Sequence, residues 1–246
     1  IKYVVLDKDE SICEQQLQDA VAYMKTTKEP YALIIKKDTF ENYTLQNNVQ
    51  NNYEMTREEA ICLVASRLES KSCVVSTTGM ISRELFEYRE SVNEGHEKDF
   101  LTVGSMGHAS QIALGIALEK SDRRICCFDG DGATLMHMGS MAIVASKQPA
   151  NYVHVIFNNG AHDSVGGQPT VGLNIDIPAV ARAVGYKKVI SVDNRDSLSV
   201  SLEEIKTSKG PILLEIKVRK GNRKDLGRPT TTPIQNKESL MEFLSK

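Results

Sequence analysis

The segment from Ile125 to Gly167 constrains the fold of this chain more than any other stretch. A short apolar run leads into Gly130-Asp131-Gly132. A helical pattern follows, with its apolar positions at Leu135, Met138, Met141, Ile143 and Val144. Pro149 ends that pattern, and a second β-type run from Tyr152 to Phe157 ends at Asn158-Asn159-Gly160. This order predicts a strand, a helix and a second strand, with polar residues at the end of each strand.

The two polar strand ends are expected to lie side by side. In a right-handed βαβ unit both strands end at the same edge of the sheet, where open α/β folds bind ligands. Asp131 and Asn159 would then offer a carboxylate and an amide oxygen to one site, a donor set that suits Mg²⁺ shared with a phosphate. Gly130 and Gly132 allow close approach of the backbone, and a helix starting near Ala133 adds its positive N-terminal end.

The spacing of these motifs carries a family resemblance. GDG, followed after 25 residues by NN, resembles the cofactor signature of the thiamine diphosphate-dependent 2-oxo acid decarboxylases. The resemblance covers residues 1 to about 220 and is strongest from Thr77 to Thr170. It implies Mg²⁺ bound by Asp131, Asn159 and the main-chain carbonyl of Ala161, together with the diphosphate. Two ordinary turns with an incidental Asp and Asn are the alternative.

Two further loops match the family. Thr78 and Gly79 follow a short buried run and precede a helix, and in the family a Thr-Gly pair here contacts the diphosphate. The stretch Gly104-Ser-Met-Gly107 resembles the loop that carries a bulky apolar residue under the cofactor. The resemblance implies that Met106 supports the bent cofactor and that the Gly104 carbonyl accepts a hydrogen bond from its amino group. An ordinary helix cap and core filling are the respective alternatives.

The loop from Gly160 to Thr170 is long, glycine-rich and full of hydrogen-bond donors, as expected of a loop that faces a substrate. It resembles the loop of phosphonopyruvate decarboxylases and, less closely, that of sulfopyruvate decarboxylases. Both substrates carry an anionic tetrahedral group at C3, which requires donors around it. We expect His108 and His162 to be catalytic, because imidazole changes charge near pH 7. The candidate substrate contacts are Ser164, Gln168 and Thr170; for every one of these residues a loop-stabilising hydrogen bond is the alternative.

Composition excludes several other classes of function. A formal charge of −2 gives no basic field for nucleic acid or an acidic membrane surface. No apolar run approaches the ~20 residues that span a bilayer. The five cysteines lack C-x-x-C spacing and lie mostly in apolar runs, which predicts free buried thiols and a cytoplasmic protein.

Helices and strands alternate from Met55 onward. Thr56 and Glu59 form a capping box before a helix. The other expected elements are strands at Cys73–Ser76, Phe100–Val103, Tyr186–Val192 and Ile212–Val218, and helices through Tyr88, to Leu118, at Leu198–Ile205 and near Lys237. This alternation predicts an α/β fold with a doubly wound parallel sheet and helices on both faces, the thiamine diphosphate-binding fold.

The chain is expected to hold parts of two domains. Residues 1–40, with a helix at Glu10–Lys25 and a strand at Tyr31–Ile35, resemble the C-terminal remnant of a pyrimidine-binding domain. Residues 41–54 are polar and predict a linker, in which Asn47-Asn48 has no expected role, and residues 55–246 form the diphosphate-binding domain. A small N-terminal extension packed on the main sheet is the alternative for the first part.

The resemblance also implies a partner and a reaction. The family's cofactor-contacting Glu belongs to a pyrimidine-binding domain, usually of a neighbouring subunit, so a homo-oligomer of at least two chains is expected. The implied reaction is thiamine diphosphate- and Mg²⁺-dependent decarboxylation of 3-phosphonopyruvate to phosphonoacetaldehyde and CO₂, a step of phosphonate biosynthesis. The alternatives are a sulfopyruvate decarboxylase, another thiamine enzyme of the acetolactate synthase type, and a non-catalytic nucleotide-binding module. The module would be expected to show G-x-G-x-x-G after its first strand.

Overall fold

The computed structural model describes residues 1–47 and 50–246, and the chain divides into two compact units, Ile1–Gln46 and Asn47–Lys246. The boundary falls within the expected linker, of which residues 48 and 49, including Asn48 of the Asn pair, lie outside the described residues. Residues 41–47 and 50–54 form neither helix nor strand.

The first unit consists of two parallel strands joined by one helix. They are β1 (Lys2–Val5), α1 (Glu10–Thr27) and β2 (Tyr31–Ile34). The helix and the second strand were predicted, whereas β1 was missed because four residues are too few to show a periodic pattern. Among the described residues of this unit, the fully buried hydrophobic side chains are those of Leu6 and Ala20. So small a buried surface is too little for an independent hydrophobic core.

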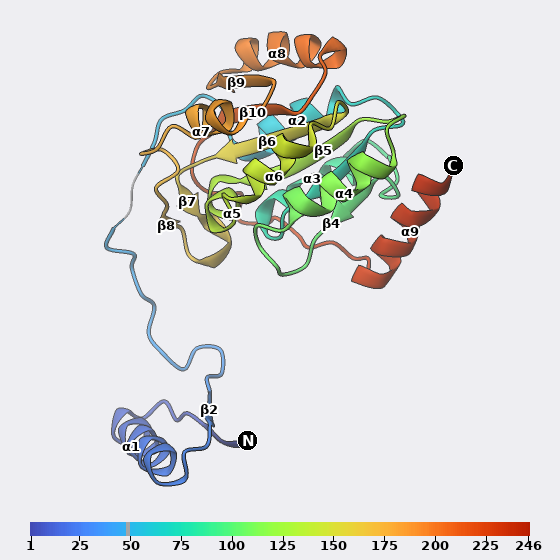
Figure 1. Ribbon diagram of the computed structural model, residues 1–246. Coiled ribbons are helices and arrows are strands. Elements are labelled where there is room, and N and C mark those ends of the chain that lie inside the picture. Colours follow the sequence, from blue (N-terminus) through green and yellow to red (C-terminus); the bar gives the residue numbers. More distant parts are fainter. Residues whose placement is uncertain (48–49) are drawn as a thin grey trace. The chain divides into compact units, whose positions relative to one another are not determined.

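The second unit is built on a parallel sheet of six strands in the order β4-β3-β5-β6-β10-β9 (Figure 1). The strands are β3 (Cys73–Ser76), β4 (Asp99–Leu101), β5 (Ile125–Gly130), β6 (Tyr152–Asn158), β9 (Lys188–Val192) and β10 (Ile212–Lys217). Side chains that alternate along β5 enter two different cores: Cys127 faces one and Phe128 the other. The predicted doubly wound α/β fold is therefore confirmed.

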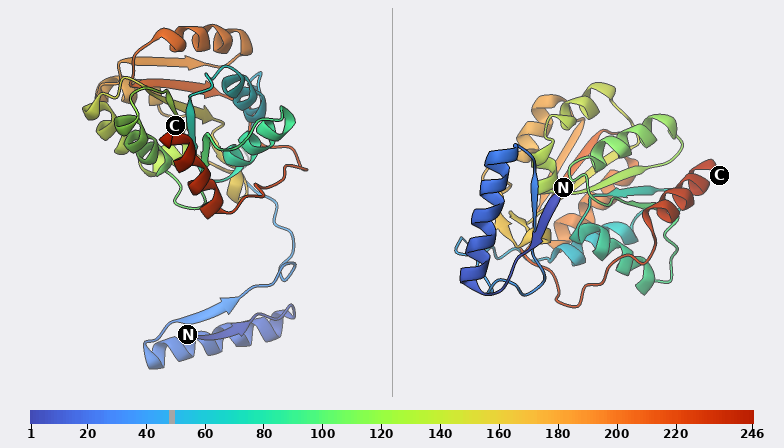
Figure 2. Two further views of the ribbon diagram at one scale, coloured as in Figure 1. Left: turned by 90° about the vertical axis from the view of Figure 1, so that its right-hand side faces the viewer. Right: turned by 90° about the horizontal axis from the view of Figure 1, so that it is seen from below.

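Helices cover both faces of this sheet, as the views in Figure 2 also show. One face is covered by α2 (Arg57–Ser66), α3 (Met80–Ser91) and α8 (Arg195–Thr207). The other is covered by α4 (Ala109–Glu119), α6 (Ser140–Lys147) and α7 (Ile177–Val184), while α9 (Pro233–Ser245) packs beside the edge strand β4. The capping box of Thr56 and Glu59 is present at the start of α2. Each strand of the sheet interior is thus buried on both faces, which explains its continuous apolar sequence.

The strand order creates a switch point between β3 and β5. From β3 the chain moves outward to β4 through α3, and then returns past β3 to β5 through α4. The connections on the two sides of this point diverge, which leaves a crevice at the carboxyl ends of β3 and β5. Thr77 and Asp131 follow these two strand ends, so the fold places them at the mouth of the crevice.

The helices that follow β5 and β6 differ from the sequence-based expectation in two places. The single helix expected after Gly132 is two helices: α5 (Asp131–Met136) starts two residues earlier than Ala133, and α6 starts at Ser140. Gly139, a poor helix former, lies at the break, and Ile143 is 50% exposed rather than part of the core. Helix α7 was not predicted, although Asp176 caps its start and Gly185 with φ 107° ends it.

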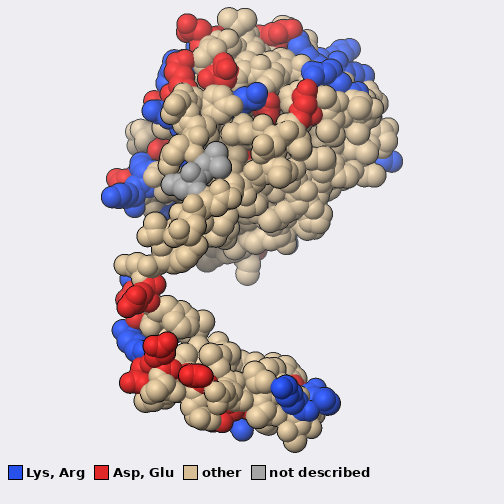
Figure 3. Space-filling view, turned by 90° about the vertical axis from the view of Figure 1, so that its left-hand side faces the viewer, with Lys and Arg blue, Asp and Glu red and all other residues tan. Residues whose placement is uncertain are grey.

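The surface carries mixed charge. On the face shown in Figure 3, basic and acidic side chains are interspersed and separated by uncharged surface. Within the described ranges, no helix is both long enough and apolar enough to span a bilayer.

Candidate functional site

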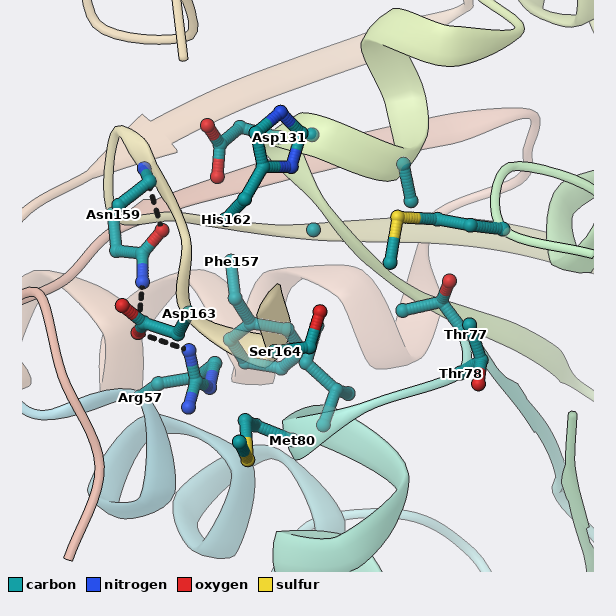
Figure 4. Close-up of a pocket in the computed structure, with 16 residues that line it drawn as sticks. Arg57, Thr77, Thr78, Met80, Asp131, Phe157, Asn159, His162, Asp163 and Ser164 are labelled. Atoms are coloured by element: carbon teal, nitrogen blue, oxygen red, sulfur yellow. Dashed lines mark hydrogen bonds and ion pairs between the residues drawn. The ribbon is translucent and has the colours of Figure 1, made fainter. Parts of the chain in front are cut away.

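A cavity opens at the switch point, where the ends of β3, β5 and β6 meet (Figure 4). Its volume is about 50 Å³, and a larger cavity of about 450 Å³ adjoins it. The two cavities share four lining residues: Thr78, Met80, Met106 and Ser164. The predicted site residues that line the smaller cavity are Thr78, Met106, Gly130, Asp131, Gly132, Ala133, Asn159, Ala161, His162 and Ser164.

Asp131, the first residue of α5, carries a buried carboxyl group that is 1% exposed. Its hydrogen bonds come from neutral donors, the hydroxyl of Thr170 and the backbone N–H of Asn159. Burial raises the pKa of Asp131, and these hydrogen bonds lower it again by a smaller amount. An ionised carboxylate at this depth is stabilised most effectively by a cation, so the group is suited to bind a metal.

The two asparagines after β6 have different partners. The Asn158 amide donates to the Gly172 carbonyl at 2.8 Å and to the Glu215 carboxylate at 2.8 Å, which ties the strand ends of β6 and β10 together. Oδ1 of Asn159 instead accepts from the Ala161 N–H at 3.1 Å, and its side chain lines the cavity. The second asparagine is therefore the one whose side chain lines the cavity.

A buried ionic network that no sequence pattern indicates includes Asn159, and two of its members, Arg57 and Asp163, also line the cavity. Nδ2 of Asn159 donates to Oδ2 of Asp163 at 2.6 Å, and Nη1 of Arg57 reaches the same oxygen at 2.9 Å. Nε and Nη2 of Arg57 each donate to Glu84 at 2.8 Å. The charged residues come from α2, α3 and the loop after β6, and their separation by up to 106 positions hides the contacts from any local pattern.

The end of β3 provides room for an anion. The buried hydroxyl of Thr77 lines the cavity and finds no hydrogen-bond partner among the residues that are described. Gly79, with φ 102°, precedes α3, whose first backbone N–H groups are free of intrahelical partners. Oγ1 of Thr78 accepts from the N–H of Gly104 at 3.2 Å, which joins this loop to the next one.

The loop from Gly104 to Gly107 presents Met106 to both cavities. Gly104 and Gly107 have φ values of 75° and 88°, which residues other than glycine rarely adopt. A Cβ on Gly107 would lie 2.8 Å from the Ala133 carbonyl oxygen, so this glycine also permits close packing against α5. The two glycines thus permit the backbone conformation on either side of Met106.

The loop after β6 brings some of the predicted residues to the cavity. His162 ends β7 (Ala161–His162), and its ring lies against Gly132, where a Cβ would be 2.5 Å from Nδ1. Ser164, in the short 3₁₀ helix Asp163–Val165, lies against Gly79, where a Cβ would be 3.0 Å from that of Ser164. Thr170 is engaged with Asp131.

Four predicted residues, Gly104, His108, Gln168 and Thr170, line neither cavity, and the first three of them are exposed. His108 is exposed, with Nδ1 at 3.1 Å from the Ser105 carbonyl and its ring 4.4 Å from that of His137. Gln168, in β8 (Gln168–Pro169), is exposed beside Gly166. A residue that was assigned no role, Asn51 of the expected linker, donates to the main-chain carbonyl of Asn159 at 3.0 Å. The sequence does not indicate a role for Asn51, because the linker shows neither helical nor strand periodicity.

A second group of potential metal ligands, Cys127, Asp129 and His154, is buried beneath the site. The imidazole of His154 lies 3.3 Å from the Tyr186 hydroxyl and 3.4 Å from the Asp129 carboxylate. These contacts satisfy both ring nitrogens inside the core, so we interpret the group as a core hydrogen-bond network.

Residues 77–216 match the family model described as the C-terminal TPP-binding domain of thiamine pyrophosphate enzymes. The chain belongs to this family. The cofactor of this family is thiamine diphosphate, and the chemistry of the cavity suits its diphosphate end: the lining includes a buried carboxylate, an unpartnered hydroxyl at Thr77 and residues at the start of a helix.

Several known proteins resemble the chain. It is 39% identical over 191 residues to a phosphonopyruvate decarboxylase of Streptomyces hygroscopicus, covering 78% of this chain and 46% of the relative. It is 33% identical over 168 residues to a sulfopyruvate decarboxylase subunit beta of Methanothermobacter thermautotrophicus, covering 68% of this chain and 84% of the relative. The chain thus spans about half the length of the phosphonopyruvate decarboxylase that it matches.

One solved structure shows the same fold. It is an X-ray structure of a protein from Mycobacterium smegmatis assigned as a thiamin diphosphate-dependent enzyme, with a TM-score of 0.57 and 21% sequence identity. The match covers 74% of this chain and 36% of that one. It supports the fold alone.

Proposed function

We propose that the protein decarboxylates 3-phosphonopyruvate to phosphonoacetaldehyde and CO₂, using thiamine diphosphate and Mg²⁺ at the switch point of the sheet. The observation that carries the proposal is the buried Asp131 carboxylate, which accepts hydrogen bonds from neutral donors and lines the same cavity as the unpartnered Thr77 hydroxyl. The relatives named above support the choice of reaction class.

The metal ligands would be the Asp131 carboxylate, Oδ1 of Asn159 and the Ala161 carbonyl, which belong to adjoining segments of one cavity wall. The diphosphate would lie against Thr78 and Gly79. The residues at the start of α5 that would also contact it are Gly130, Gly132 and Ala133. On this proposal the Gly104 carbonyl and Met106 would contact the organic part of the cofactor, next to the larger cavity.

When bound, thiamine diphosphate supplies the electron sink that a 2-oxo acid needs to lose CO₂. The protein supplies orientation, proton transfer and exclusion of water. His162 lines the cavity beside Gly132 and would hold or donate a proton there, since imidazole can do either near pH 7. Ser164 offers a hydroxyl to the anionic C3 group from the wall that both cavities share.

The geometry gives less support to the roles predicted for Thr170, His108 and Gln168. The Thr170 hydroxyl donates to Asp131 and accepts from the Gly172 N–H at 3.0 Å, so we assign it to holding the metal ligand rather than the substrate. Contacts of His108 and Gln168 with the substrate would require that these exposed side chains move. We therefore rank His162 and Ser164 first for mutagenesis.

A sulfopyruvate decarboxylase is the second candidate, because the chain spans most of a beta subunit of that enzyme from Methanothermobacter thermautotrophicus. The C3 groups of the two substrates are both tetrahedral anions, and hydroxyl and imidazole donors serve both. In either case we propose that a pyrimidine-binding domain, from this subunit or a neighbouring one, completes the cofactor site. The buried free thiols at Cys73, Cys126 and Cys127 support a cytoplasmic location.

CO₂ release from phosphonopyruvate, sulfopyruvate and pyruvate tests the proposal. The assay uses the intact protein with thiamine diphosphate and Mg²⁺, and Asp131→Ala is the control. We expect the highest kcat/KM with phosphonopyruvate and loss of activity in Asp131→Ala. A preference for sulfopyruvate would establish the second candidate, and tight cofactor binding without turnover of any substrate would contradict the decarboxylase proposal.

A further inference from the structure

We propose that Asp163 is the positioning residue that holds the Asn159 amide with Oδ1 toward the metal, and that Arg57 and Glu84 hold Asp163 in place. This inference rests on the proposed Mg²⁺ site. It assigns roles to three residues that do not contact the metal themselves. Figure 4 shows the chain of contacts from Asn159 through Asp163 to Arg57, along one wall of the cavity.

The orientation of an amide side chain is decided by what its two ends contact. The oxygen and nitrogen of an asparagine are nearly equal in shape, so only hydrogen bonds distinguish the two orientations. An ionised carboxylate can only accept, and therefore the Asn159 NH₂ group must point to Asp163, which it contacts at 2.6 Å. Oδ1 is left on the opposite side, where it accepts from the Ala161 N–H at 3.1 Å and is available to a metal.

Asp163 is itself fixed by several donors. Its Oδ2 accepts from Asn159, from Nη1 of Arg57 at 2.9 Å and from the Gly221 N–H at 3.0 Å. The side chain of Asp163 is 6% exposed. Three donors on one oxygen leave the carboxylate little freedom to rotate.

Arg57 is held in turn by a two-point contact. Its Nε and Nη2 donate to the two oxygens of Glu84 at 2.8 Å each, and the side chains of Arg57 and Glu84 are 5% and 2% exposed. A bidentate pair fixes the plane of the guanidinium group, so that Nη1 remains directed at Asp163. Two helices of the scaffold, α2 and α3, thereby determine the orientation of one ligand of the proposed metal.

Loss of Asp163 is expected to weaken metal binding more than it changes the fold. Asp163→Asn keeps the size of the side chain but can present an NH₂ group to the Asn159 amide, which removes the preference for one orientation. Removing such an orienting partner typically costs a factor of about 10 to 100 in metal affinity. We therefore expect the Kd for Mn²⁺, measured with thiamine diphosphate present, to rise by about that factor.

The test measures Mn²⁺ binding by electron paramagnetic resonance in the intact protein with saturating thiamine diphosphate. Asp176→Asn is the matched control, because Asp176 is an exposed helix cap whose role Asn also fulfils. This control is expected to bind Mn²⁺ like the wild type. If the wild type itself binds no Mn²⁺, the proposed function fails; if it does and Asp163→Asn binds equally well, the inference alone is overturned.

A reciprocal exchange separates positioning from a structural role. The double variant Asp163→Asn with Asn159→Asp restores one amide–carboxylate contact with its direction reversed and leaves a carboxylate oxygen for the metal. We expect it to bind Mn²⁺ at least about tenfold more tightly than Asp163→Asn alone, because the ligand is oriented again. No recovery, with native circular dichroism in both variants, would show that Asp163 supports the loop rather than the ligand and would overturn the inference.

Discussion

Two buried carboxylates of the site, Asp131 and Asp163, differ in their partners and therefore in their expected behaviour. Asp163 accepts from the Arg57 guanidinium, whereas Asp131 accepts from a hydroxyl and a backbone N–H. A cationic partner offsets the cost of burying a charge, and neutral donors offset less of it. Asp131, which accepts no hydrogen bond from a cationic side chain, is the carboxylate that we assign to the metal.

Asp131→Asn is expected to stabilise the metal-free protein at neutral pH. Burial raises the folded-state pKa of Asp131, so its contribution to stability is fully present below its ordinary pKa and is lost as the pH rises through the raised value. The asparagine of the variant does not ionise, so the variant does not lose this stability as the pH rises. In urea unfolding with EDTA present, the variant should therefore have a higher free energy of unfolding than the wild type at pH 8 but not at pH 4. Equal or lower stability of Asp131→Asn at pH 8 would contradict the role given to burial.

The sequence predicts a site role for some of these residues but not for others. Asp131 and Asn159 follow strand ends that the apolar runs make visible, and their spacing carries the family resemblance. Arg57, Glu84 and Asp163 lie on three segments, and each alone has the pattern of an ordinary surface charge. Only the packing of α2 against α3 shows that they are buried together, and no spacing encodes that packing.

At the scale of elements, the sequence predicts where strands end better than where helices divide. The strands β3 and β6 match their predicted positions closely, because both faces of each are apolar. The break between α5 and α6 was missed because the apolar residues keep a helical spacing across Gly139. The division has a consequence for the site: α5 is short and carries Asp131 at its first position, directly on the end of β5.

The Arg57–Glu84 contact joins α2 to α3. Glu84→Gln leaves a buried guanidinium without one of its carboxylates, which is expected to lower the free energy of unfolding by about 3 kcal/mol. The matched control is Glu203→Gln, since Glu203 pairs with Arg67 where both side chains are about half exposed, and a loss below about 0.5 kcal/mol is expected there. Equal losses in urea unfolding would show that the buried pair does not hold the helices together.

At the scale of the whole molecule, we expect the second unit to be a stable body from Met55 onward. The Met55 side chain is 1% exposed and its carbonyl accepts from the Arg219 N–H at 2.8 Å, whereas Phe40 and Tyr43 are 59% and 77% exposed. Brief chymotrypsin treatment should cut after Phe40 or Tyr43 and leave a resistant fragment, identified by mass spectrometry. First cleavage within residues 55–218 would contradict the proposed domain boundary.

The central claim is that the carboxyl edge between β3, β5 and β6 holds a diphosphate through a divalent cation bound to Asp131. Isothermal titration calorimetry of thiamine diphosphate into the intact protein, in Mg²⁺ and then in EDTA, tests this claim most directly. We expect binding in Mg²⁺, a loss of affinity of at least about 100-fold in EDTA, and no gain from Mg²⁺ in Asp131→Ala. The same affinity with and without Mg²⁺ would contradict it.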